Sequence, residues 1–219
     1  MNFIIVDASR KYDVGDLSFD SLSRERAAGL NHVWSLGERF SAGFFGNWGE
    51  STSDNIVSLY KYGPGLEYNL YPYREYSIHE ISFRYQFYHS QYKYYEKTVF
   101  GAMDDDLWQQ FATASAVFRK EWGSIDASLA YKKYIDDSDL YSLNFSTWIT
   151  ITAGKGFSFY VSGSYAVIHD QVYISAEGAT TEEILLKLKT LQTDYRFGVH
   201  AGVTYTFGSV YNNTVNTRF

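Results

Sequence analysis

The sequence predicts an all-β protein, specifically a transmembrane, antiparallel, up-and-down β-barrel. Three observations predict it. Aromatic residues make up 19% of the 219 residues, with 21 tyrosines among them, and such side chains favour strands. Apolar and polar residues alternate in runs that reach the roughly 9–11 residues a tilted strand needs to cross a bilayer. Short and long polar connectors alternate between the runs, as in outer-membrane barrels.

The clearest alternation lies in four segments, namely residues 78–92, 139–152, 157–168 and 195–207. In the first segment Phe83 and Phe87 occupy odd positions, whereas Arg84 and Gln86 occupy even ones. Because neighbouring strand residues point to opposite faces, this pattern predicts an apolar face toward lipid and a polar face toward the lumen. Residues 2–9 and 20–50 alternate less cleanly.

The connectors divide the chain into about ten strands, an even number as bacterial barrels require. Short turns are predicted near residues 36–39, 71–74, 121–124 and 154–156. Longer connectors are predicted at residues 10–17, 49–54, 96–106, 135–139 and 173–192. The short turns are expected on the periplasmic side and the long loops outside the cell.

One short helix is predicted in the longest extracellular loop. Thr180 and Glu183 have capping-box spacing, and Ile184, Leu188 and Leu191 then recur on one helical face. The helix could pack on the barrel rim, lie at the membrane surface or dock a partner.

Composition excludes several classes of function. The net charge is −6 and no basic stripe is present, so a nucleic-acid partner is not expected. The chain has no cysteine, which rules out disulfides and thiolate metal sites. No apolar stretch is long enough for a transmembrane helix, and no motif predicts a metal or a cofactor.

The chain is expected to begin partway through an exported protein. Its first residues, 1–7, lack the basic and long apolar regions of a signal peptide and resemble a strand instead. The predicted location, the bacterial outer membrane, requires export. Lipid and lipopolysaccharide are therefore expected partners.

Charged residues at polar positions of the alternation are predicted to face the lumen. They are Lys61, Glu67, Glu80, Arg84, Asp126, Lys132 and Arg196. Such charges usually pair across a small barrel and fill it. The alternative is a polar path for a small solute, with these charges setting selectivity.

The last alternating segment carries a polar residue, a glycine and two aromatics, at His200, Gly202, Tyr205 and Phe207. This pattern resembles the C-terminal signal that the bacterial barrel-assembly machinery reads, so that machinery is an expected partner during biogenesis.

Several longer stretches resemble an uncharacterised family of outer-membrane β-barrels from the Bacteroidota. They are residues 62–73, 122–125, 168–173, 178–186, 205–213 and 215–219. The resemblance runs from about residue 57 to the end and departs from the family at Thr217, where proline is usual. Family members carry a signal peptide, a periplasmic-side region and about two more strands, which implies a full barrel of about twelve strands. Residues 1–208 are thus expected to be the C-terminal part of the barrel, and residues 209–219 a tail.

No residue pattern predicts an enzyme. His169 and Asp170, like Asp136 and Asp137, are adjacent and so would point to opposite faces of a strand, unlike the pairs of omptin proteases. His79 and His89 face lipid without the Ser and Asn of a phospholipase. Residues 104–106 are expected to be a solvated loop tip.

The predicted function is therefore a non-enzymatic structural, partner-binding or assembly role, with a protein partner at residues 173–192 or on the tail. A narrow, porin-like pore or transporter is the alternative, and a membrane-embedded hydrolase ranks third. The alternative fold is a soluble lipocalin-like barrel, which would have the opposite polarity of faces.

Overall fold

A computed structural model of the chain describes residues 2–14, 17–75, 79–154, 156–176 and 193–207. Ten strands form a single sheet in which each strand pairs with the next one along the chain. They are β1 (Asn2–Val14), β2 (Leu17–Ser35), β3 (Phe40–Ser51), β4 (Ile56–Asn69), β5 (His79–Tyr94), β6 (Asp104–Lys120), β7 (Gly123–Tyr134), β8 (Tyr141–Gly154), β9 (Phe157–Ile168) and β10 (Tyr195–Tyr205). The one helical element in these residues is a 3-10 turn, η1 (Tyr73–Glu75).

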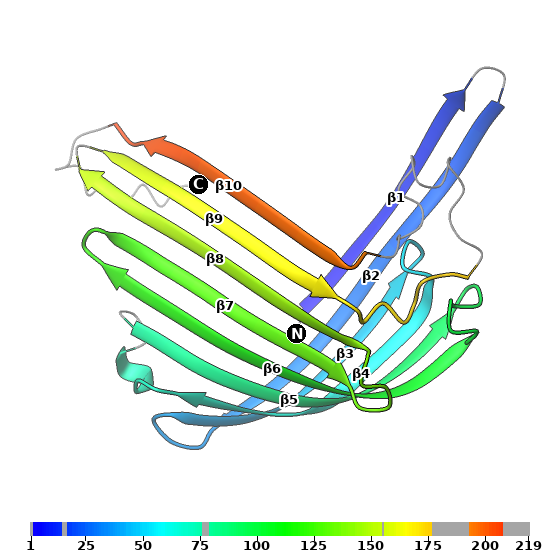
Figure 1. The fold of residues 1–219 in the computed structure, drawn as a ribbon, viewed down its shortest axis with the longest axis horizontal. Helices are drawn as coiled ribbons and strands as arrows, with labels where there is room; N and C mark the ends of the chain where they lie inside the picture. Colours follow the sequence, from blue (N-terminus) through cyan, green and yellow to red (C-terminus); the bar gives the residue numbers. More distant parts are fainter. Residues whose placement is uncertain (1, 15–16, 76–78, 155, 177–192, 208–219) are drawn as a thin grey trace, which may run out of the picture.

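The sheet curls into an open trough whose two edges are β1 and β10 (Figure 1). The predicted all-β, antiparallel, up-and-down architecture is confirmed. No pairing joins β1 to β10 within the described part of the chain, so closure into a barrel stays a prediction. The strands are 11 to 19 residues long, which is enough for tilted strands to cross a bilayer.

The connections after β2, β4, β6 and β8 lie at one end of the trough, on the left in Figure 1. The other connections lie at the opposite end, including the longest one, between β9 and β10. We call these two ends the turn end and the loop end. The predicted connector at residues 10–17 is wrong, because β1 continues to Val14 and pairs there with Leu17. The polar residues of this stretch belong to the strand because their backbone groups pair with those of β2, whatever the polarity of their side chains. The predicted helix and the C-terminal tail lie outside the described residues.

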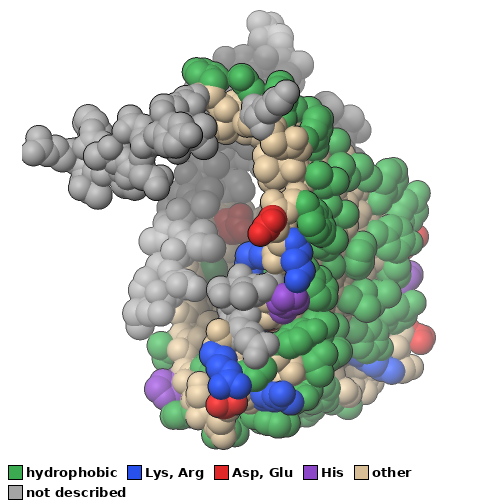
Figure 2. Space-filling model, turned by 90° about the vertical axis from the view of Figure 1, so that its left-hand side faces the viewer, with side chains coloured by type: hydrophobic (Ala, Val, Ile, Leu, Met, Phe, Trp, Pro, Cys, Tyr) green, Lys and Arg blue, Asp and Glu red, His purple; other side chains and the backbone are tan. Residues whose placement is uncertain are grey.

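The two faces of the sheet differ in chemistry, as the alternation predicts. Large apolar side chains cover the convex face and are exposed there, including Phe145 and Phe159. Figure 2, viewed from the turn end, shows hydrophobic side chains spread over this flank. The concave face carries small polar residues such as Ser82 and Ser142, both buried. No helix among the described residues is long and apolar enough to cross a membrane.

A row of serines crosses the concave face at one level. Register pairs Ser82 with Ser115, Ser115 with Ser128, Ser128 with Ser146, and Ser146 with Ser164. The hydroxyls of Ser115 and Ser128 lie 3.4 Å apart. Since serine is small, the row leaves the middle of the trough hollow.

Candidate functional site

All seven charged residues predicted to face the lumen lie on the concave face. Register aligns Lys61 with Ser90, Glu67 with Arg84, and Asp126 with Val117. The remaining members of the set lie an even number of residues from concave positions of their own strands and so share that face. They are Glu80, Lys132 and Arg196. The structure separates them into groups rather than one network.

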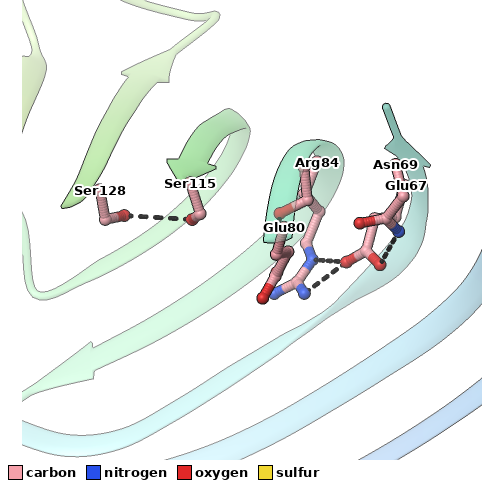
Figure 3. Close-up of polar contacts among 7 residues, drawn as sticks. Glu67, Asn69, Glu80, Arg84, Ser115 and Ser128 are labelled. Atoms are coloured by element: carbon pink, nitrogen blue, oxygen red, sulfur yellow. Dashed lines mark hydrogen bonds and ion pairs between the residues drawn. The ribbon is translucent and has the colours of Figure 1, made fainter. Parts of the chain in front are cut away.

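The first group lies on β4 and β5 (Figure 3). The guanidinium group of Arg84 donates from Nε and Nη2 to Oε2 of Glu67, at 2.9 and 2.5 Å. Asn69 donates to the other oxygen of Glu67, at 3.0 Å. Ser82 donates to Glu80 at 3.2 Å. The Arg84 side chain is about half exposed, so its ion pair contributes little stability.

The second group lies toward the loop end and is largely buried. The ammonium group of Lys61 lies 4.2 Å from the ring centroid of Tyr88 and 5.7 Å from that of Phe111. These are cation–π distances. The ammonium group of Lys132 forms an ion pair with Asp170 and lies 5.2 Å from the ring centroid of Tyr134.

Asp170 belongs to a segment that turns inward and occupies the loop end of the trough. We call residues 170–176 the plug segment. Its side chains Val172 and Ile174 are 2% and 8% exposed. Val172 packs in a buried cluster on the concave face, whose other members are Ile56, Tyr92, Tyr94 and Tyr134.

The plug segment is also held through its backbone. Val99 donates to the carbonyl of Ile174 at 2.8 Å, and Ala176 donates to that of Lys97 at 2.8 Å. Between them, Thr98 and Ser175 form an antiparallel bridge. Two loops that are distant in sequence therefore meet across the loop end.

Asn55 ties a third loop to this assembly. Its amide nitrogen donates to the carbonyls of Glu96 at 2.9 Å and Tyr173 at 3.2 Å, and its side-chain oxygen accepts from the backbone N–H of Glu96 at 2.8 Å. The residue has a positive φ of 61°, a conformation that asparagine tolerates better than most residues. Burial raises the pKa of the Tyr173 phenol in the plug segment.

Tyrosines line the floor beneath the plug segment. The hydroxyls of Tyr92 and Tyr134 lie 3.0 Å apart, and Tyr94 donates to Asp105 at 2.8 Å. Gln109 donates a hydrogen bond to the hydroxyl of Ser90. Side chains whose polar atoms bond to one another thus cover the concave face at the loop end.

The residues considered for hydrolysis do not assemble. The ring of His169 packs on Tyr141 with centroids 5.1 Å apart, whereas Asp170 points to Lys132. Asp136 accepts a hydrogen bond from the backbone of Trp108 at 2.9 Å. Among the described residues, no group of three or more His, Asp or Glu side chains is placed to hold a metal ion.

On the convex face, His89 has partners that the sequence did not suggest. Its Nδ1 lies 3.0 Å from the Tyr62 hydroxyl, and its Nε2 pairs with Asp106. The ring also lies 4.5 Å from that of Trp108. The cluster therefore groups aromatic rings and polar tips on the convex face toward the loop end.

The residues of the predicted assembly signal divide between the faces. His200 and Gly202 share the concave parity of β10, opposite Ser162 and Tyr160. Tyr205 packs against Phe157, with ring centroids 4.5 Å apart, and lies 6.0 Å from Phe207.

Two concave residues were missed because they break the alternation. Trp148 follows Ser146 and precedes Thr150 on the concave face of β8, and Tyr160 lies between Ser158 and Ser162 on that of β9. Their rings stack with centroids 5.1 Å apart and planes 4° from parallel. An aromatic at a polar position in two neighbouring strands was the signal that could have identified this pair.

No protein-family model, no curated protein and no solved structure matches the chain.

Proposed function

We propose that this chain is a membrane-embedded β-barrel protein of the bacterial outer membrane, closed at its loop end and acting in a structural or partner-binding role. The observation that carries the proposal is the placement of apolar side chains. Phe197 and Val199 on the convex face are 71% and 72% exposed, and many other large apolar residues share that face. Water-soluble monomers rarely expose such a continuous apolar surface, whereas lipid solvates it.

The polar concave face supports the same proposal. Soluble barrels bury apolar side chains inside, but the concave face here carries serines, asparagines and charged residues. A membrane barrel needs the sheet to close, since unpaired backbone groups are costly in hydrocarbon. The proposal therefore includes pairing of the β1 and β10 edges, directly or through further strands.

The plug segment favours a closed protein over an open pore. Its apolar side chains are buried against tyrosines of the concave face, and its backbone bridges a second loop. A solute path along the concave charges would meet this obstruction at the loop end. The described residues also form no catalytic arrangement, so we place the partner-binding surface on the loops at residues 173–192 or on the tail.

Membrane insertion can be tested residue by residue, because the chain has no cysteine of its own. Single cysteines at positions 144 to 151 of β8 would carry a nitroxide spin label in lipid nanodiscs. Collision with oxygen, which partitions into lipid, is compared with collision with a water-soluble nickel chelate. We expect oxygen to dominate at odd positions such as Phe145 and nickel to dominate at even ones such as Ser146.

Neighbouring positions on the same strand serve as matched controls for each other. Nickel collision at the odd positions, with protection at the even ones, would mean a soluble barrel and would overturn the proposal. Equal collision rates at both sets would mean that the sheet does not separate lipid from water.

A further inference from the structure

The concave face has a hollow toward the turn end that the plug segment does not reach. Its volume is about 550 Å³. All serines of the row except Ser82 line it, together with the carboxylates of Glu80 and Asp126 and the side chains of Trp148 and His200. We call it the turn-end basin. Its size suits a small organic molecule.

An aromatic platform forms one wall of the basin. Tyr160 stacks on one face of the Trp148 indole. Tyr160 is itself backed by Gly202, where an added Cβ would lie 2.4 Å from the tyrosine ring. The indole nitrogen donates to the hydroxyl of Thr150 at 3.0 Å. The ring is thus fixed in orientation, and its free face lies toward β7.

A carboxylate residue lies beside Trp148 on the neighbouring strand. Asp126 is the residue directly opposite Trp148 in the β7–β8 register. Its carboxylate forms no ion pair with any other described residue. Glu80, the second carboxylate of the basin, accepts a hydroxyl hydrogen bond from Ser82 and forms no ion pair with another described residue.

No lysine or arginine is among the described residues that line the basin. Lys61 and Lys132 lie at the loop end, as does Arg196 in the register of β10, and Arg84 is paired with Glu67. Arg119 shares the concave parity of β6 but is exposed near the end of that strand and does not line the basin. The basin therefore combines an excess of negative charge with an aromatic face. Aromatic rings and carboxylates together are the chemistry that recognises organic ammonium ions.

We propose that the turn-end basin binds a small organic ammonium ion, with its cationic head between the Trp148 ring and the carboxylates of Asp126 and Glu80. The serine hydroxyls would donate hydrogen bonds to a polar substituent of the same molecule or accept them from it. Binding at this site does not require the proposed membrane location.

The test compares choline with its uncharged isostere 3,3-dimethyl-1-butanol on the full chain refolded in deuterated detergent micelles. Saturation-transfer NMR on the methyl protons gives a dissociation constant for each. We expect choline to bind saturably and at least about tenfold more tightly than the isostere, because only the cation gains from the ring and the carboxylates. Equal binding of the two, or no binding of either, would overturn the proposal.

Variants locate the site. Trp148→Leu and Asp126→Asn should each weaken choline binding about fivefold or more, whereas Trp148→Phe should keep most of it. Trp34→Leu and Asp104→Asn, both on the convex face, are the matched controls and should bind as the original chain does. Choline binding that survives both concave substitutions would place the ligand elsewhere, and the comparison of choline with its isostere decides the question even if a variant fails to fold.

Discussion

The ammonium group of Lys132 in β7 and the carboxylate of Asp170 in the plug segment form an ion pair on the concave face. Asp170 is 8% exposed, so neither partner could lose the other and regain full hydration. Asp170→Ala should therefore lower the free energy of unfolding by roughly 3 kcal/mol, because it leaves the partly buried ammonium group of Lys132 unpaired. Urea unfolding in detergent micelles measures this loss.

A double-mutant cycle with Lys132→Ala separates the pair from the rest of the plug segment. The coupling should be clearly larger than that of the half-exposed pair Arg84 and Glu67, for which we expect at most about 1 kcal/mol. Equal coupling in the two cycles would show that the plug segment leaves Asp170 hydrated.

The two faces of β8 should respond oppositely to charge. Phe145→Arg places a cation on the convex face and should cost about 2–4 kcal/mol if that face meets lipid near the bilayer midplane. Asn144→Arg, one residue away on the concave face, should cost far less. Reversible unfolding in lipid vesicles measures both. A larger penalty for Asn144→Arg would indicate that the concave face is the dry one.

Gly202→Ala should destabilise β10, since the new Cβ would overlap the Tyr160 ring. We expect a loss of about 1–3 kcal/mol, as for overpacked sites. Replacing Tyr160 with serine in the same chain should recover most of it. Gly202 also belongs to the predicted assembly signal. The amount of the Gly202→Ala variant that reaches the outer membrane of cells should therefore be measured separately from its stability in vitro. A variant that refolds normally in vitro but fails to accumulate in cells would assign the glycine to targeting instead.

Refolded protein in a planar lipid bilayer should be electrically silent, because the plug segment fills the loop end. Val172→Asp together with Ile174→Asp should expel that segment from its tyrosine cluster and produce conductance steps. The control is Ile135→Asp, which changes an exposed loop residue. A bilayer containing this variant should show no conductance steps. Steady, ion-selective steps from the unaltered chain would favour the pore over the closed protein.

Sequence alternation predicted the strands and their faces because side-chain direction repeats every two residues. It placed Arg84 and Asp126 on one face without any knowledge of pairing. It failed at residues 10–17, where polarity suggested a connector but backbone pairing continues the strand. Side-chain polarity does not determine where a strand ends, because the end of a strand depends on whether its backbone still has a paired neighbour.

The meeting of distant segments was beyond sequence reasoning. Nothing local indicates that Val172 packs against Tyr134, since that contact depends on the curvature of the whole sheet. Trp148 and Tyr160 were within reach, because each departs from the polar pattern of its own strand. An aromatic residue at a polar position of a strand therefore marks a concave side chain that merits inspection for a binding role.

The plug segment has a consequence for the order of events in folding. Ser175 donates to Glu96, a residue 79 positions away in the chain, and β6 to β9 lie between the two. Contacts of such long range pay a large loop-closure cost and form only after the intervening strands have paired. The sheet would therefore curl first, with its loop end still open, and the plug segment would seat last. Substitutions in the plug segment should then increase the rate at which the segment detaches far more than they decrease the rate at which the strands pair.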